Sequence, residues 1–201
     1  MKIWKTLLLA GMVFGTKNLQ AKGKPFADSL IKYQQEYKED LYKIIKDDTA
    51  YICFFEANEQ YRVKAKITLL DNEPVFQMPT ASGKTKDAQK VAVLEFAING
   101  KPLKLYAYQL IKLREKPETA GELFVPFTDN TNGRSSYGGG RYIDLNLRNI
   151  KDGSITIDFN RAYNPYCAFT TGYNCPIPPK ENYLNTKIKA GEKYLPEKFH
   201  H

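Results

Sequence analysis

The stretch YRVKAKITL, residues 61–69, decides the fold class. Apolar residues stand at its odd positions, from Tyr61 to Leu69, and polar residues at its even positions, from Arg62 to Thr68. Because successive side chains of a β-strand point to opposite faces, this alternation predicts a strand with one buried face. The stretch therefore indicates a sheet that covers a core on one side only.

The segment before this strand has a different period. From Phe26 to Lys46, apolar residues recur every three or four positions, as on one face of a helix, with Asp28 or Ser29 as the cap. Cys53, between the helix and the strand, is predicted to be a small core residue.

The chain after residue 69 continues with strands and turns. Asn99-Gly100 is a strong hairpin signal, and residues 71–74 and 79–87 consist of turn-forming residues. Further strands are predicted at residues 91–98, 103–113, 122–127, 141–147, 154–159 and 183–189. One helix followed by antiparallel strands predicts a mainly β (α+β) domain, either an antiparallel β-sandwich or a partly open β-barrel with one N-terminal helix.

The N-terminus reads as a secretory signal. Lys2 and Lys5 precede an apolar run at residues 6–15, and Ala21 offers a small residue for cleavage. We therefore predict a signal peptide at residues 1–21 and a single β-rich domain at residues 22–201, exported to the periplasm, the cell surface or the medium. No later segment is long and apolar enough to span a bilayer, so no membrane span is expected in the mature form.

The charge of the mature chain is mildly basic. The signal holds three lysines and no acids, so its removal lowers the formal net charge from +8 to +5. Nucleic-acid binding requires basic residues clustered on one face, whereas lysine and arginine are scattered here. We expect no nucleic-acid partner; the oligomeric state is not readable.

Histidine and cysteine content excludes several site types. The only histidines are His200 and His201, so serine and cysteine triads and histidine-rich zinc sites are not expected. Cys167 and Cys175 close a short loop and can form a structural disulfide in an oxidising compartment, with two free thiols as the alternative. We predict no metal and no cofactor.

Polar side chains concentrate in the last strands. If residues 141–161 form a hairpin with coinciding apolar faces, Asp144 lies opposite Asp158 or Asn160, and Arg141 and Arg161 lie at its open end. Facing carboxylates need an arginine, a proton or a cation between them. The candidate ligand-binding residues are Tyr137, Arg141, Asp144, Asp158, Asn160, Arg161, Tyr163 and Asn164.

The same region carries a family resemblance. YGGGRY at residues 137–142, DFNRAYNP at 158–165, CPIPP at 175–179 and AGEK at 190–193 follow FTD at 127–129. Their order resembles that of domain-of-unknown-function family 1684, exported bacterial proteins. The resemblance implies an extracytoplasmic β-rich domain and supplies no reaction.

Three functions fit this pattern. The first is binding of a small anionic or hydroxylated ligand, such as a glycan fragment or metabolite, in a polar cleft. The second is a structural or protein-interaction domain in which the motif residues only brace the fold. The third is a hydrolase that uses the carboxylate pair. Whether the protein is an enzyme stays open; the sequence leans against it.

Overall fold

The computed structural model describes residues 20–199, with side chains from Pro25 onward. Its helices are α1 (Gln20–Ile45) and the short α2 (Ile111–Arg114). Its strands are β1 (Arg62–Leu69), β2 (Val75–Pro79), β3 (Thr85–Ile98), β4 (Lys101–Leu110), β5 (Glu122–Asp129), β6 (Arg141–Asn146), β7 (Ser154–Asp158) and β8 (Tyr183–Leu184). Short 3-10 helices are η1 (Lys46–Tyr51), η2 (Glu59–Tyr61), η3 (Leu147–Asn149), η4 (Phe159–Arg161), η5 (Tyr166–Ala168), η6 (Lys180–Asn182) and η7 (Pro196–Lys198).

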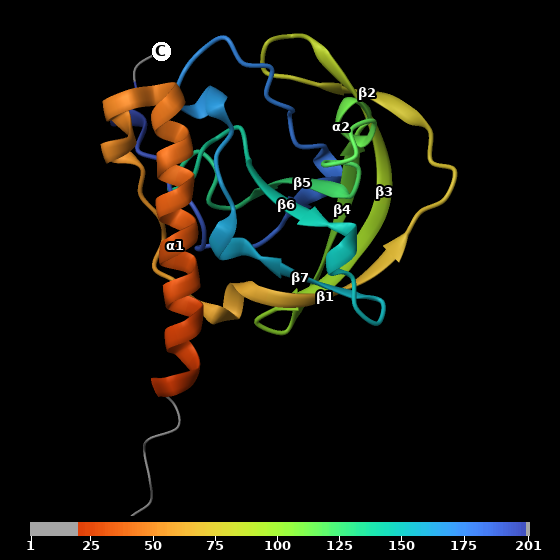
Figure 1. Ribbon diagram of the computed structural model, residues 1–201, viewed down its shortest axis with the longest axis horizontal. Helices are drawn as coiled ribbons and strands as arrows, with labels where there is room; N and C mark the ends of the chain where they lie inside the picture. The colour runs from red at the N-terminus through yellow and green to blue at the C-terminus, as the bar shows by residue number, and fades with distance from the viewer. Residues whose placement is uncertain (1–19, 200–201) are drawn as a thin grey trace, which may run out of the picture.

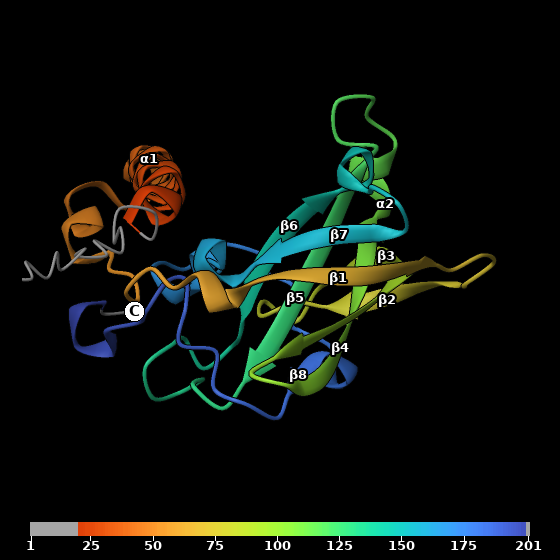
Figure 2. The ribbon, with the colours of Figure 1, turned by 90° about the horizontal axis from the view of Figure 1, so that it is seen from below.

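The strands form one curled sheet in the order β6-β5-β4-β3-β1-β7, with β2 beside β3 and β8 beside β5 (Figures 1 and 2). All pairs are antiparallel except β5 with β8. The sheet curls into a half-barrel, so the predicted class is confirmed in its second form, a partly open barrel with an N-terminal helix.

The inner face of the sheet holds the main core. Alternate residues of β1, such as Ala65 and Ile67, are buried there, as the pattern of residues 61–69 predicted. Phe159 lies at the centre, with ring centroids 5.4 Å from Phe127 and 5.6 Å from Phe96. Burying one such ring contributes about 1.5–3 kcal/mol.

Helix α1 stands outside one end of the half-barrel (Figures 1 and 2). The C-terminal half of α1 packs into a second, smaller core made by Leu41, Ile45, Ile52, Ala168, Phe169 and Phe199. The last described residues thus pack with α1. The helix is fixed by this cluster at one end and by polar contacts at the other.

The predicted hairpin of residues 141–161 is wrong. Strand β6 pairs with β5, where Asp144 lies opposite Phe124, and β7 pairs with β1, where Asp158 lies opposite Arg62. The two strands are the opposite edges of the sheet, brought near each other because the sheet curls. Residue alternation fixes which face of a strand is buried and leaves its neighbour undetermined, so the faces were predicted correctly and the partner was not.

Several element boundaries also differ from the prediction. Helix α1 begins at Gln20, so neither Asp28 nor Ser29 caps it. The predicted loop at residues 79–87 is shorter in the structure, because β2 ends at Pro79 and β3 begins at Thr85; residues 111–113 belong to α2, and the last strand has two residues. Cys53 is half-buried in a loop instead of in the core. Of the predicted signal peptide, residues 1–19 lie outside the described residues.

Candidate functional site

A cleft of about 1030 Å³ lies between the edge strands β6 and β7 and extends under the N-terminal half of α1. Residues 143–146 form one wall, Thr156 and Asp158 the other, and Phe26, Leu30 and Tyr33 face them from the helix. The volume lies at the upper end of the range for ligand pockets, about 300–1000 Å³. The cleft exists because the two edges of the sheet approach without pairing.

Two isolated antiparallel bridges lie at the ends of the cleft. Tyr142 and Tyr163 exchange two main-chain hydrogen bonds of 2.9 and 3.0 Å, which form an isolated antiparallel bridge. At the opposite end, Lys151 in the connection from β6 to β7 exchanges two main-chain hydrogen bonds of 2.8 and 2.9 Å with Ser154, the first residue of β7. The cleft is therefore a slot with two closed ends.

Four of the eight predicted ligand-binding residues line this cleft: Asp144, Asp158, Arg161 and Tyr163. The Tyr163 hydroxyl donates a 2.6 Å hydrogen bond to Asp144. Asp158 accepts two hydrogen bonds from Asn160 on one oxygen, and its other oxygen lies 3.7 Å from the Arg161 guanidinium. The two carboxylates thus have different partners, and no arginine bridges them.

Asp144 is an exposed carboxylate on the β6 wall of the cleft. Its side chain reaches solvent through the opening, while protein surrounds it on most sides. This partial burial raises the pKa of Asp144, the hydrogen bond from Tyr163 lowers it, and the nearby Glu122 carboxylate raises it further. The pKa of Asp144 is therefore higher than that of an aspartate in water.

Arg161 connects the cleft to helix α1. Its guanidinium donates a 2.9 Å hydrogen bond to the Ser29 hydroxyl and lies 5.0 Å from the centre of the Tyr33 ring. The Tyr33 hydroxyl donates a 2.8 Å hydrogen bond to the Arg161 carbonyl. These contacts hold the N-terminal half of the helix over the slot, and they use part of the hydrogen-bonding capacity of the Arg161 guanidinium.

Arg141 lies away from the cleft, in the interior. Its side chain and that of Asp129 are both 0% exposed and form a 2.7 Å ion pair. The guanidinium also donates to the carbonyls of Ile188 and Ala190. Arg141 therefore fastens the AGEK segment to the end of the barrel, and its placement removes it from the candidate ligand site.

Glu192 is a buried carboxyl that joins three parts of the chain. It accepts a 2.8 Å hydrogen bond from the Tyr37 hydroxyl of α1 and a 2.7 Å hydrogen bond from the Asn164 main chain. Its burial raises its pKa to about 8, against the opposing effect of these donors and of Arg141. The Asn164 side chain donates to the Lys193 carbonyl at 2.9 Å, so Asn164 is also internal.

The other two predicted ligand residues brace loops. Asn160 is buried, and its amide exchanges two 3.0 Å hydrogen bonds with the main chain of Asn58. Tyr137 is half-buried, stacks edge-on against Tyr194, and donates a 3.3 Å hydrogen bond to the Cys167 carbonyl. Neither lines the cleft.

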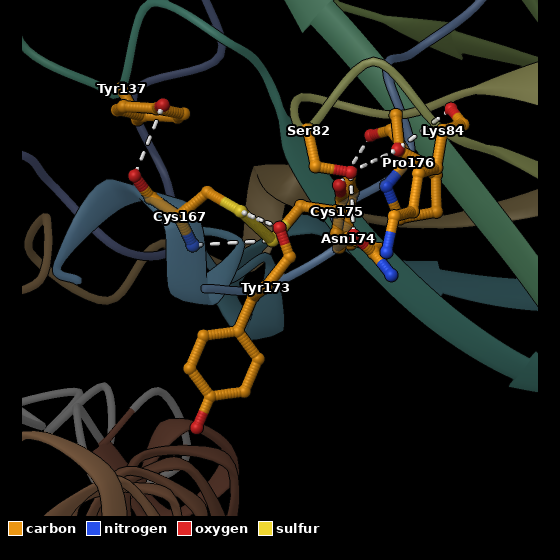
Figure 3. The surroundings of a disulfide bond; sticks show 10 residues. Ser82, Lys84, Tyr137, Cys167, Tyr173, Asn174, Cys175 and Pro176 are labelled. Carbon is orange, nitrogen blue, oxygen red and sulfur yellow. Dashed lines mark hydrogen bonds between the residues drawn. A yellow bond between two sulfur atoms is a disulfide. The ribbon is translucent and has the colours of Figure 1, made fainter. Parts of the chain in front are cut away.

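The predicted disulfide is confirmed (Figure 3). Cys167 and Cys175 are bonded, with Cα atoms 6.2 Å apart. The Cys167 main chain donates a 3.2 Å hydrogen bond to the Cys175 sulfur. The bond closes the loop that follows DFNRAYNP and so stiffens the chain between η5 and η6.

Two kinds of feature are missing from residues 20–199. These residues contain no cluster of three or more histidine, cysteine or acidic side chains placed to hold a metal ion. They also contain no helix that is both long and apolar enough to cross a membrane.

Sequence reasoning missed several residues that shape the site. Arg62 at the start of β1 and Glu59 in the preceding η2 line the cleft, because β1 and not β6 is the partner of β7. Tyr33 and Tyr37 were read only as apolar positions of the helix. For Glu192 a signal was present, since AGEK was one of the motifs, but a motif does not say that its acid is buried.

The chain belongs to the DUF1684 family of proteins of unknown function, whose model matches residues 48–193. This confirms the resemblance drawn from the motifs. The chain is also similar to an uncharacterised protein of Haloarcula marismortui solved by solution NMR, with 30% identity and a TM-score of 0.66 over 87% of this chain and 97% of that one. No curated protein matches.

Proposed function

We propose that the protein binds a small polar ligand in the slot between β6 and β7. The observation that carries this proposal is that four polar residues of the motif region line one ligand-sized cleft. Tyr33 and Phe26 supply flat faces on the helix side, and the carboxylates, the Tyr163 hydroxyl and Thr156 supply hydrogen-bonding groups. An apolar wall opposite convergent polar groups is typical of small-molecule sites.

The charges of the cleft narrow the ligand class. Its acids are Glu59, Glu122, Asp144 and Asp158, and its only described basic residues are Arg62 and Arg161. Arg161 is engaged by Asp158, Ser29 and Tyr33. An anionic ligand would meet more negative than positive charge, so we favour an uncharged or cationic ligand with hydroxyl or amide groups, such as a glycan fragment or another polar metabolite.

Binding outside the cytoplasm is part of the proposal. A disulfide persists in oxidising compartments, and the N-terminal sequence has the charge and length of a signal peptide. The alternative of a purely structural domain draws on Arg141, Asn160 and Asn164, all of which brace the fold.

A ligand screen tests the proposal. The purified protein is examined by native mass spectrometry for a co-purified molecule and by thermal shift against sugars, polyols, amines and short peptides. We expect a stabilising ligand whose shift is reduced in Asp144→Asn and unchanged in Asp71→Asn, an equivalent change in an exposed turn outside the cleft. If no compound stabilises the wild type, or Asp144→Asn responds as the wild type does, the binding function is refuted.

A further inference from the structure

Two carboxylates are neighbours on the outer face of the sheet, beside the cleft. In the ladder between β5 and β6, Phe124 lies opposite Asp144, and Glu122 lies opposite Asn146. The residues that alternate with these four belong to the core, so the four side chains point outward. Glu122 is therefore the diagonal neighbour of Asp144, at about 7–8 Å between Cα atoms.

Neither carboxylate has a cation beside it among the residues whose side chains the structure describes. The side chain of Glu122 is half-buried and makes no hydrogen bond or ion pair with those residues. Asp144 accepts the hydrogen bond of Tyr163 on Oδ2, and its Oδ1 has no partner among them. Burial raises the pKa of Asp144, the Tyr163 hydroxyl lowers it and the Glu122 charge raises it. The two acids therefore repel each other without compensation.

The pair stands where two hollows of the surface meet. Both acids line the cleft under α1, and both line a second cavity of about 30 Å³ beside α2. Leu110, Leu113 and Phe124 form the apolar part of this small cavity. A water molecule requires about 10–15 Å³ of such volume, so the cavity accepts a group of the size of an ammonium. A ligand can thus place a small head between the acids and leave its body in the cleft.

The surroundings of the pair favour a cation over an anion. Phe124 follows Glu122 on the same face of β5, and its ring packs edge-on against Tyr142 with centroids 4.8 Å apart. An ammonium is attracted to the face of such a ring as well as to the carboxylates. Arg114 also lines the small cavity, but its guanidinium donates a hydrogen bond to a glutamine of β3 and is not among the groups that shift the pKa of Asp144.

The number and kind of groups in the cleft indicate an organic amine. Glu122 and Asp144 supply two carboxylates, whereas Ca²⁺ takes about six to eight oxygen ligands. The few N–H groups of an ammonium need fewer acceptors. Beyond the pair, the cleft is lined by the amide of Asn146, the hydroxyl of Thr156 and the ring of Tyr33. Such groups orient a ligand that carries hydroxyls of its own.

We propose that the ligand of the cleft is a primary amine on a hydroxylated body, such as an amino sugar, with its ammonium group between Glu122 and Asp144. This inference rests on the proposed function of the same cleft and specifies its ligand class. The ammonium donates to Glu122 and to Oδ1 of Asp144 and lies against the Phe124 ring. The hydroxylated body extends along β6 and β7 under α1.

Matched sugars test this directly by titration calorimetry. The probes are glucosamine and galactosamine, their N-acetyl derivatives, and glucose and galactose, all in low salt at a pH at which the amines are protonated. We expect at least one amino sugar to bind at least tenfold more tightly than both of its neutral counterparts. Added salt should weaken this binding, because it screens the attraction between the charges. In ¹H–¹⁵N NMR the bound amine should shift the amides of Glu122 and Asp144.

The outcomes separate the two proposals. If a neutral sugar binds as tightly as its amino counterpart, or if neutral compounds bind in the cleft and no amine does, the amine inference is overturned and the proposed function stands. If Ca²⁺ binds at the pair and no amine does, the amine inference is overturned as well. If no sugar, polyol, amine or peptide binds, both proposals fail.

Variants of the protein test the pair itself. Glu122→Gln removes one charge and should weaken binding of the amino sugar at least fivefold. Glu95→Gln, at an exposed position of β3 outside the cleft, is the control and should bind as the wild type does.

A second readout needs no ligand. Glu122→Lys places an ammonium of the protein beside Asp144, so the pKa of Asp144, followed by carboxyl ¹³C NMR, should fall, and amino-sugar binding should be lost. If Glu122→Lys does not fold, Glu122→Gln should lower the same pKa by removing the like charge. An unchanged pKa of Asp144 in the folded variant overturns the inference, because the two acids then do not share a site.

Discussion

The buried pair of Arg141 and Asp129 allows the sharpest test of how this fold is held together. Arg141→Met leaves the Asp129 carboxylate buried without its cation, and Asp129→Asn leaves the guanidinium without its anion. Both side chains are 0% exposed, so water cannot replace the lost partner. Removing one member of such a pair costs about 3–5 kcal/mol.

Asp129→Asn is the more conservative of the two single changes. Its oxygen can keep the bonds that Asp129 accepts from the main chain of Thr131 at 2.7 Å and of Ile188 at 3.2 Å. Its amide nitrogen, however, places an N–H donor where Asp129 accepts a hydrogen bond from the Arg141 guanidinium. The variant therefore removes the charge and one acceptor of Asp129 while it keeps the size of the side chain and its main-chain bonds.

Urea unfolding measures the effect. With a slope of about 2 kcal/mol per molar urea, a loss of about 3–5 kcal/mol lowers the midpoint by about 1.5–2.5 M. The double variant Arg141→Met/Asp129→Asn removes both charges, so its loss should be smaller than the sum of the single losses by about 2 kcal/mol or more. Single variants within about 0.5 kcal/mol of the wild type would refute the structural role and return Arg141 to the list of ligand residues.

Three further changes test other parts of the structure. The pKa of Glu192 in the folded state, about 8, lies above its unfolded value, so the folded state binds one more proton between these two values. The free energy of unfolding should therefore fall as the pH rises from about 5 to 8, by up to about 1.4 kcal/mol per pH unit. Above pH 8 it should level off. Glu192→Gln should remove this slope in urea titrations at several pH values; an unchanged slope contradicts the assignment. Replacing Cys167 and Cys175 by serine should lower the free energy of unfolding by about 2–3 kcal/mol, because the unfolded chain gains the entropy of a short open loop. An unchanged melting temperature would contradict the presence of the disulfide. Gly191→Ala should be the more damaging of two glycine changes, because its Cβ would lie 2.5 Å from the Ala162 carbonyl oxygen, whereas at Gly172 a Cβ meets nothing within 4 Å; equal melting temperatures would contradict this packing.

The sequence predicted those parts of the fold that depend on local alternation. The faces of β1, β6 and β7, the turn at Asn99-Gly100 and the helix before the sheet follow from side-chain period and turn chemistry. Strand order does not, because residues 154–158 present the same apolar face to the core beside either β6 or β1. The error in the hairpin came from choosing the nearer strand along the chain.

The position of the candidate site was predicted more accurately than the list of its residues. Asp144, Asp158, Arg161 and Tyr163 meet at one cleft, although β6 and β7 do not pair. Arg141 could not be separated from them by sequence, since a buried arginine and a ligand-binding arginine look alike in a motif. Its partner Asp129 stands on β5, two residues beyond the position opposite Arg141, and the pairing of β5 with β6 brings the two together.

The pairing of β1 with β7 also has a consequence for the order in which the chain folds. Arg62 and Asp158 lie opposite each other although most of the sheet separates them in sequence. Non-local pairings of this kind slow folding to milliseconds or seconds, because the loop must close before its contacts are gained. A chain emerging from its N-terminus therefore holds an open β1 edge until β7 arrives, and Glu192 arrives later still. The contact of Glu192 with Tyr37 joins the N-terminal helix to a residue that follows every strand, so synthesis of the whole sheet must precede it.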